Sequence, residues 1–196
     1  GGARKSKKSP APELEKGTFD YIREPKSDCF SVGFAKTDVM PDDMDKTAYY
    51  VAGYRMNNPA KGVLDPMTAS AVWIDDLSGR GGVVFVSIDD IGLTNYDVGI
   101  IRDLLADFKK ESGCRSINIM SIHNHASIDT VGLWGPLPRS GRNKKYMELL
   151  AQKVKQVVLD AYNDRRDGDL YYGKKEAEAI QRDSRLPEVY SKDVHR

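Results

Sequence analysis

The chain has 196 residues, of which 40% are hydrophobic, so it is long enough and apolar enough for one domain with a core. Its 30 Lys and Arg residues are balanced by 29 Asp and Glu residues, which gives no global electrostatic reason to expect a nucleic-acid binder. No apolar run approaches the length of a membrane span.

The amino-terminal part combines a basic tail with the first predicted strands. Residues 1–16 carry five basic side chains and two prolines, which predicts a flexible basic tail. Residues 30–36 predict a short strand, and residues 38–58 predict a long loop of the kind that often carries function. Alternation over residues 68–75 predicts a second strand with Ala69, Ala71 and Trp73 on one face.

The middle of the chain predicts one βαβ unit. Residues 83–88 form a near-continuous apolar run, typical of a strand buried on both faces. Thr94 or Asn95 can cap an amphipathic helix, and Gly113 occupies the place of a left-handed C-terminal cap. Residues 116–122 predict the next strand, so the two strands flanking the helix should run parallel.

The remaining elements complete an α/β fold. Residues 129–142 predict a Gly- and Pro-rich loop, residues 144–165 a second long amphipathic helix, and residues 170–172 a short strand. Together these elements predict a mixed sheet with a parallel βαβ core and flanking helices. The two cysteines, Cys29 and Cys114, lack CxxC spacing and predict free, mostly buried thiols, although a single disulfide stays open.

The most informative segment is INIMSIHNHASIDTVGLWG at residues 117–135, which holds two of the three histidines. His123 and His125 follow a predicted strand, and in extended backbone side chains two residues apart point the same way. The pair should therefore project from the carboxyl edge of the sheet, where open α/β folds build their sites. Neutral imidazole suits zinc, so the pair predicts a metal or catalytic site. Purely structural, hydrogen-bonding histidines are the alternative.

Two further positions near the histidine pair allow either a functional or a structural role. Asp89 and Asp90 end the preceding strand, where one of them can orient a metal-bound His, or Asp90 can cap the turn into the helix. Trp134 can line a pocket or pack over the sheet. His195 lies two residues from the end and is expected to be solvated.

The order of these segments resembles the amino-terminal region of the neutral/alkaline, non-lysosomal ceramidases. The resemblance runs from about residue 30 to 187 and includes SVGFAKTDVMP, the pair Gly53–Tyr54, VVFVSIDD and the element SRLP at residues 184–187. Its strongest element is IHNHASIDTVGLWG, which is similar to the family's Thr-His-Thr-His-Ser-Gly-Pro segment.

The resemblance implies zinc-dependent hydrolysis of the amide bond of a lipid such as ceramide. His123 matches the family's zinc ligand and His125 the catalytic histidine beside it, while Arg185 matches an arginine that faces the substrate. Asp129 and Trp134 in the intervening loop are further candidate substrate contacts. The family's other zinc ligands would follow Arg196, so residues 17–196 would form the amino-terminal part of an incomplete catalytic domain.

The differences between this sequence and the family motif weaken the inference about the substrate more than the inference about a metal site. Asn124 stands where the family has Thr, and Ala126, Ser127 and Ile128 replace Ser-Gly-Pro, which indicates a divergent bacterial branch. The resemblance also implies a lipid amide as partner, allows peripheral membrane contact and favours a secreted or cell-surface location, with the oligomeric state open.

Three other functions compete with this interpretation. One is a metallohydrolase that acts on another amide or an ester, and another is a non-catalytic binding or scaffold domain of the same fold. The weakest is nucleic-acid binding through the basic tail.

Overall fold

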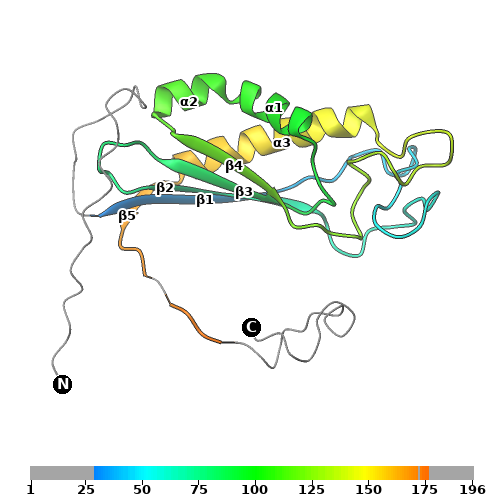
Figure 1. The fold of residues 1–196 in the computed structure, drawn as a ribbon, viewed down its shortest axis with the longest axis horizontal. Coiled ribbons are helices and arrows are strands. Elements are labelled where there is room, and N and C mark those ends of the chain that lie inside the picture. The colour runs from blue at the N-terminus through cyan, green and yellow to red at the C-terminus, as the bar shows by residue number, and fades with distance from the viewer. Residues whose placement is uncertain (1–28, 172, 177–196) are drawn as a thin grey trace, which may run out of the picture.

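The computed structural model describes residues 29–171 and 173–176, so the basic tail, Arg185 and His195 lie outside the described residues. The described chain forms a five-stranded sheet in the order β4-β3-β2-β1-β5, with helices packed against it (Figure 1). The elements are, in chain order, β1 (Phe30–Asp38), β2 (Thr68–Asp75), β3 (Val83–Ile88), α1 (Asn95–Leu104), α2 (Ala106–Ser112), β4 (Ser116–Ser121), α3 (Lys144–Asn163) and β5 (Arg166–Gly168).

The sheet is mixed, as the sequence predicted. β1 pairs antiparallel with both β2 and β5, and β2 pairs antiparallel with β3. β3 and β4 pair in parallel, with Val83 opposite Ser116 and Ile88 opposite Ser121. The predicted βαβ unit is therefore confirmed, and it brings the carboxyl ends of β3 and β4 to the same edge of the sheet.

All the helices lie on one face of the sheet (Figure 1). α3 packs across β1 and β2, where Ala69, Ala71 and Trp73 are buried as predicted. Gly33 permits this close approach, because a Cβ there would lie only 2.0 Å from the Ala161 carbonyl oxygen of α3. The core of the domain therefore lies between the sheet and its single layer of helices.

Three details of the predicted elements are wrong. β3 is not buried on both faces, because its residues alternate and Phe85 faces away from the helices with 41% of its surface exposed. The predicted helix after Thr94 is interrupted at Leu105, whose backbone leaves the helical region and separates α1 from α2. The predicted strand at residues 170–172 is absent at 170–171, and β5 pairs with β1 at Arg166–Gly168 instead.

Two local predictions are confirmed in detail. Thr94 caps α1, since its hydroxyl accepts a hydrogen bond from the Asp97 N–H. Gly113 ends α2 with φ of 68°, the left-handed conformation that favours glycine. No disulfide joins Cys29 and Cys114; Cys29 is half-buried, and burial raises the pKa of Cys114 to about 11. Among the described residues, no helix is both long and apolar enough to cross a bilayer.

Long connections gather at one end of the molecule. Residues 39–67, drawn in blue to cyan, and residues 122–143, drawn in yellow-green, lie beyond the carboxyl ends of β3 and β4 (Figure 1). β5 and the start of β1 lie at the opposite end. We refer to the first end, defined by these two connections, as the loop end.

Candidate functional site

The parallel pairing of β3 and β4 continues past the last residue of β4, Ser121. The Ile122 N–H donates to the Ile88 carbonyl at 3.1 Å, and the Asn124 N–H donates to the Asp90 carbonyl at 2.8 Å. The His-bearing segment is therefore anchored by backbone hydrogen bonds at the carboxyl edge of the sheet, where the sequence placed it.

The two histidines meet, but the predicted reason is wrong. His123 has φ of 63°, so the backbone between the histidines is left-handed rather than extended. Their rings nevertheless lie edge to face, with 4.5 Å between the centroids and 79° between the planes. Left-handed backbone at a non-glycine residue costs about 1 kcal/mol or more and persists where surrounding contacts hold it.

One such contact fixes the ring of His123. Its Nδ1 lies 2.8 Å from the carbonyl oxygen of Ile91, in the connection between β3 and α1. Because a carbonyl oxygen only accepts, Nδ1 carries the proton and donates, which leaves the lone pair of the neutral ring on Nε2. This arrangement is the one that prepares a histidine to bind a metal through Nε2.

His125 is positioned by a segment more than 70 residues earlier in the chain. Tyr50, Val51 and Ala52 pair with residues 127–129: the Asp129 N–H donates to the Tyr50 carbonyl at 2.8 Å, and the Ala52 N–H donates to the Ser127 carbonyl at 2.9 Å. This pairing brings the residues that follow Ala52 against the His-bearing turn.

Gly53 and Tyr54 form the surroundings of His125. Gly53 has φ of 119°, and a Cβ there would lie 2.7 Å from three atoms of the His125 side chain. The Tyr54 ring lies 4.9 Å from the His125 ring, centroid to centroid. The Nδ1 atom of His125 is buried without a hydrogen-bond partner in the described chain, so this ring reaches a substrate only through Nε2.

Asn124 shapes the turn that separates the two histidines. Its side-chain oxygen accepts a hydrogen bond from the Ala126 N–H at 2.8 Å, and its carbonyl accepts one from the Ser127 hydroxyl at 2.8 Å. This is an Asx-type turn, for which Asn is well suited. The residue that departs from the ceramidase motif therefore has a structural function here.

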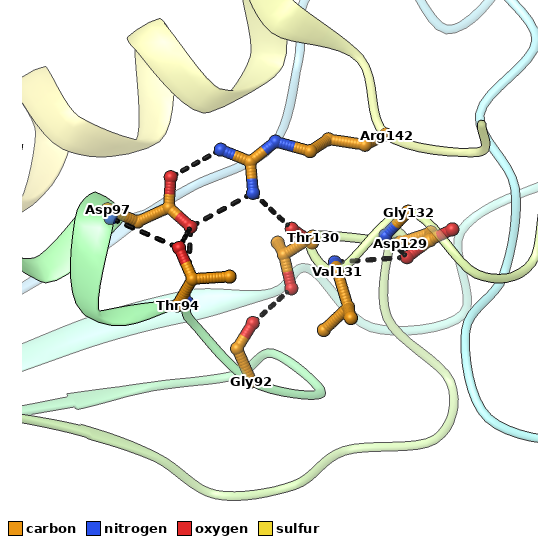
Figure 2. A network of polar contacts seen from close by, with 8 residues as sticks. All are labelled: Gly92, Thr94, Asp97, Asp129, Thr130, Val131, Gly132 and Arg142. Carbon is orange, nitrogen blue, oxygen red and sulfur yellow. Dashed lines mark hydrogen bonds and ion pairs between the residues drawn. The ribbon is translucent and has the colours of Figure 1, made fainter.

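Asp129 lies fully buried, and its carboxylate organises the loop that follows. It accepts hydrogen bonds from the backbone N–H groups of Val131 at 3.0 Å and Gly132 at 2.6 Å (Figure 2). It accepts a third from the Trp134 N–H at 2.8 Å. Trp134 also accepts a hydrogen bond from the Asn57 N–H at 2.9 Å through its carbonyl. Both residues thus shape the loop end, and their predicted role as substrate contacts stays a prediction.

An ion pair between Arg142 and Asp97 connects the loop that follows Asp129 to the first turn of α1. Arg142 donates to both carboxylate oxygens of Asp97 and to the Thr130 carbonyl, and the Thr130 hydroxyl donates to the Gly92 carbonyl at 2.6 Å (Figure 2). Burial alone would raise the pKa of Asp97, but hydrogen bonds from Arg142 and Thr94 outweigh it and lower the pKa below its usual value.

Asp89 and Asp90 have different surroundings. Asp89 accepts hydrogen bonds from the Thr68 N–H at 2.8 Å and from its hydroxyl at 2.7 Å, which ties β3 to the start of β2. Asp90 is 1% exposed and has no well-directed hydrogen-bond partner in the described chain. Burial raises its pKa to about 6, although the nearby Ser121 hydroxyl opposes the shift. Asp97, not Asp90, completes the cap of α1.

A cavity of about 630 Å³ opens beside the His-bearing turn. Asp89, Asn124 and Ala126 are among the residues that line it. Most of the remaining wall is apolar and comes from Met40, Met44, Val51, Pro59, Val63, Leu64, Met67 and Ile128. A cavity of this size and lining suits a ligand with an apolar portion.

His123 fits as one zinc ligand, because its Nε2 lone pair is directed by the bond to Ile91. The described residues contain no group of three or more His, Cys, Asp or Glu side chains that could hold a metal together. Neither the predicted zinc site nor the predicted role of His125 is tested by this geometry, and both stay predictions.

The sequence motifs left three contributors to this site unassigned. Gly53 and Tyr54 entered only through the family resemblance, although a glycine before an aromatic residue in a long loop is a signal for close packing. Ile91 contributes only its carbonyl oxygen, and no pattern of side chains reveals such a contact.

Comparison with known proteins identifies structures of similar fold but no related sequence. No protein-family model matches the chain, and no curated protein matches it in sequence. Among solved structures, the neutral ceramidase from Pseudomonas aeruginosa is similar with a TM-score of 0.57 and 15% identity, over 72% of this chain and 22% of that chain. A ceramidase complexed with C2 is similar with a TM-score of 0.53 and 15% identity, over 71% and 22%. The chain therefore has a ceramidase-like fold and spans about a fifth of the length of these ceramidase chains.

Proposed function

We propose that this chain supplies part of the active site of a zinc-dependent hydrolase that cleaves the amide bond of a lipid such as ceramide. The observation that carries the proposal is the paired rings of His123 and His125 at the carboxyl edge of a ceramidase-like sheet, with the Nε2 of His123 left available by the bond to Ile91. On this proposal the chain belongs to a divergent bacterial branch of the family.

The roles of the two rings differ. His123 would hold zinc through Nε2, and zinc when bound would act as a Lewis acid that activates water and polarises a carbonyl. His125, whose Nδ1 is buried, would use Nε2 to donate a hydrogen bond to the developing oxyanion or to move a proton to the leaving amine. Further zinc ligands would come from outside the described residues.

The neighbouring cavity supports a lipid substrate. Its lining combines Asn124 and Ala126 of the His-bearing turn with apolar side chains such as Met67. An amide held at the histidines could therefore extend an alkyl chain into the cavity. Arg185, which the sequence resemblance assigns to the substrate, lies outside the described residues.

The test is a pair of substitutions in the longest natural polypeptide that contains this chain. His123→Ala should lose both zinc, measured by elemental analysis, and hydrolysis of a short-chain ceramide. His125→Asn should keep zinc and lose at least about a hundredfold in kcat, as expected for a general acid or base. Gln152→Ala is the control, since Gln152 is an exposed residue of α3.

Two outcomes point elsewhere. If zinc binds and is lost with His123→Ala while ceramide is not cleaved, the alternative of another amide or an ester as substrate is favoured. If the protein holds no zinc and His123→Ala changes nothing, the chain is a non-catalytic binding or scaffold domain.

A further inference from the structure

Large apolar side chains are turned toward solvent on several neighbouring loops at the loop end. They belong to three segments at that end, around residues 54–56, 63–64 and 133–137 (Figure 1). The residues are Tyr54, Met56, Val63, Leu64, Leu133 and Leu137. The most exposed is Leu64, at 97%, in a run of six consecutive exposed residues from 61 to 66.

Two of these segments are held together, and the third lines the cavity. The Asn57 N–H donates to the Trp134 carbonyl at 2.9 Å, which holds residues 54–58 against residues 133–137. Val63 and Leu64 line the same cavity as Asn124 and Ala126 of the His-bearing turn. The exposed apolar tip and the interior of the cavity are therefore continuous.

The polar residues of this surface match those of proteins that lie at a lipid–water boundary. Arg55, Lys61 and Arg139 are exposed among the apolar side chains. Asp65 is exposed next to Leu64, and Asp42 and Asp45 are exposed elsewhere in residues 39–67. Leucine side chains that enter the acyl region, with Tyr and basic side chains at headgroup level, are the pattern of interfacial binding. Lys and Arg can also lay their aliphatic stems along apolar surface while the charge stays in water.

We propose that the loop end docks on the surface of a lipid aggregate, with Val63 and Leu64 inserted among the acyl chains and the cavity mouth facing the lipid. Separate protruding tips around a cavity fit a deformable lipid surface better than the flat, continuous patch of a protein interface. The docking rests on the proposed function, because it would let an alkyl chain pass from the lipid into the cavity without crossing water.

The test uses the longest natural polypeptide that contains this chain, with lipid alone and without zinc or substrate turnover. Binding to sucrose-loaded vesicles of phosphatidylcholine is measured by co-sedimentation for the wild type and for Val63→Ser/Leu64→Ser. Losing two inserted aliphatic side chains should weaken partitioning at least about tenfold. Leu137→Ser tests the neighbouring loop and should weaken it by a smaller factor.

Leu170→Ser is the matched control. Leu170 is exposed, but it follows β5 at the opposite end of the sheet, so the variant should bind vesicles as the wild type does. Because all the substituted side chains are exposed, the variants should keep the wild-type thermal midpoint, which circular dichroism checks.

Three results would overturn the docking. The first is no binding of the wild type to phosphatidylcholine vesicles. The second is binding only to phosphatidylglycerol vesicles that disappears in high salt, which indicates electrostatic adsorption without insertion. The third is self-association of the wild type that is lost with Val63→Ser/Leu64→Ser, which assigns the surface to a protein contact. None of these results would change the zinc content or the ceramide hydrolysis that test the proposed function.

Discussion

The ring of His125 lies edge to face on the ring of His123, 4.5 Å away between centroids, although β4 ends two residues before the first of them. The contact depends on a left-handed backbone at His123 and on the loop that carries Gly53 and Tyr54. The arrangement is therefore a product of several segments, each of which can be tested by substitution.

Replacing Gly53 with Ala should displace His125. The new Cβ would meet the imidazole at 2.7 Å, and a φ of 119° is unfavourable for any residue with a side chain. We expect a loss of about 1–3 kcal/mol in the free energy of unfolding, measured with denaturant. Gly62→Ala is the control, since a Cβ there meets nothing within 4 Å. Equal stability of the two variants would show that the His125 ring yields without cost.

The bond to Ile91 predicts the tautomer of His123. With Nδ1 donating to the carbonyl at 2.8 Å, the neutral ring should carry its proton on Nδ1 and leave Nε2 bare. Nitrogen-15 chemical shifts of the imidazole distinguish the two tautomers of the neutral ring. A proton on Nε2 would contradict the arrangement proposed for metal binding.

Asp129→Asn should loosen the loop at residues 131–134. The carboxylate accepts three backbone hydrogen bonds with its two oxygens, whereas an amide offers one acceptor and adds an unpaired donor. We expect a loss of about 1.5–3 kcal/mol in stability and faster hydrogen exchange at the Val131, Gly132 and Trp134 amides. Asp42→Asn, at an exposed position, should change neither measurement.

Arg142 and Asp97 should be energetically coupled. The Asp97 side chain is 4% exposed, so removing Arg142 leaves a buried carboxylate without its main partner. A double-mutant cycle with Arg142→Met and Asp97→Asn should give a coupling energy of about 1–3 kcal/mol in unfolding experiments. Additive effects of the two substitutions would mean that this ion pair does not hold the loop to α1.

Asp90 predicts a specific pH dependence of stability. Its pKa is raised to about 6 in the folded protein from a usual value of 3.8, so the folded state binds the proton more tightly. The stabilisation by protonation is complete below about pH 4 and is lost as the pH rises through 6. Asp90→Asn cannot ionise, so its stability relative to wild type should increase by about 2–3 kcal/mol between about pH 4 and pH 8. Parallel stability profiles of the two proteins would refute the raised pKa.

Local patterns in the sequence were sufficient for most elements of the fold. The alternation over Thr68–Asp75 and the apolar run over Val83–Ile88 mark two strands with the bounds that the structure has, and Thr94 and Gly113 mark the ends of the helical segment between β3 and β4. Such patterns are informative because side-chain periodicity and capping are properties of residues close together in the chain. The parallel βαβ connection followed from the order of elements, and with it the position of the histidines at the carboxyl edge.

Tertiary structure alone decided how that edge is built. The apolar run predicts that Phe85 is buried. It is instead exposed, because all the described helices cover one face of the sheet and Phe85 lies on the other. The Asp129 carboxylate accepts hydrogen bonds from three loop amides, a structural contact that the sequence pattern did not reveal. The His125 surroundings come from Gly53 and Tyr54, and the His123 orientation from a carbonyl of Ile91. These outcomes depend on contacts between segments far apart in the chain, whose energies no local pattern of residues encodes.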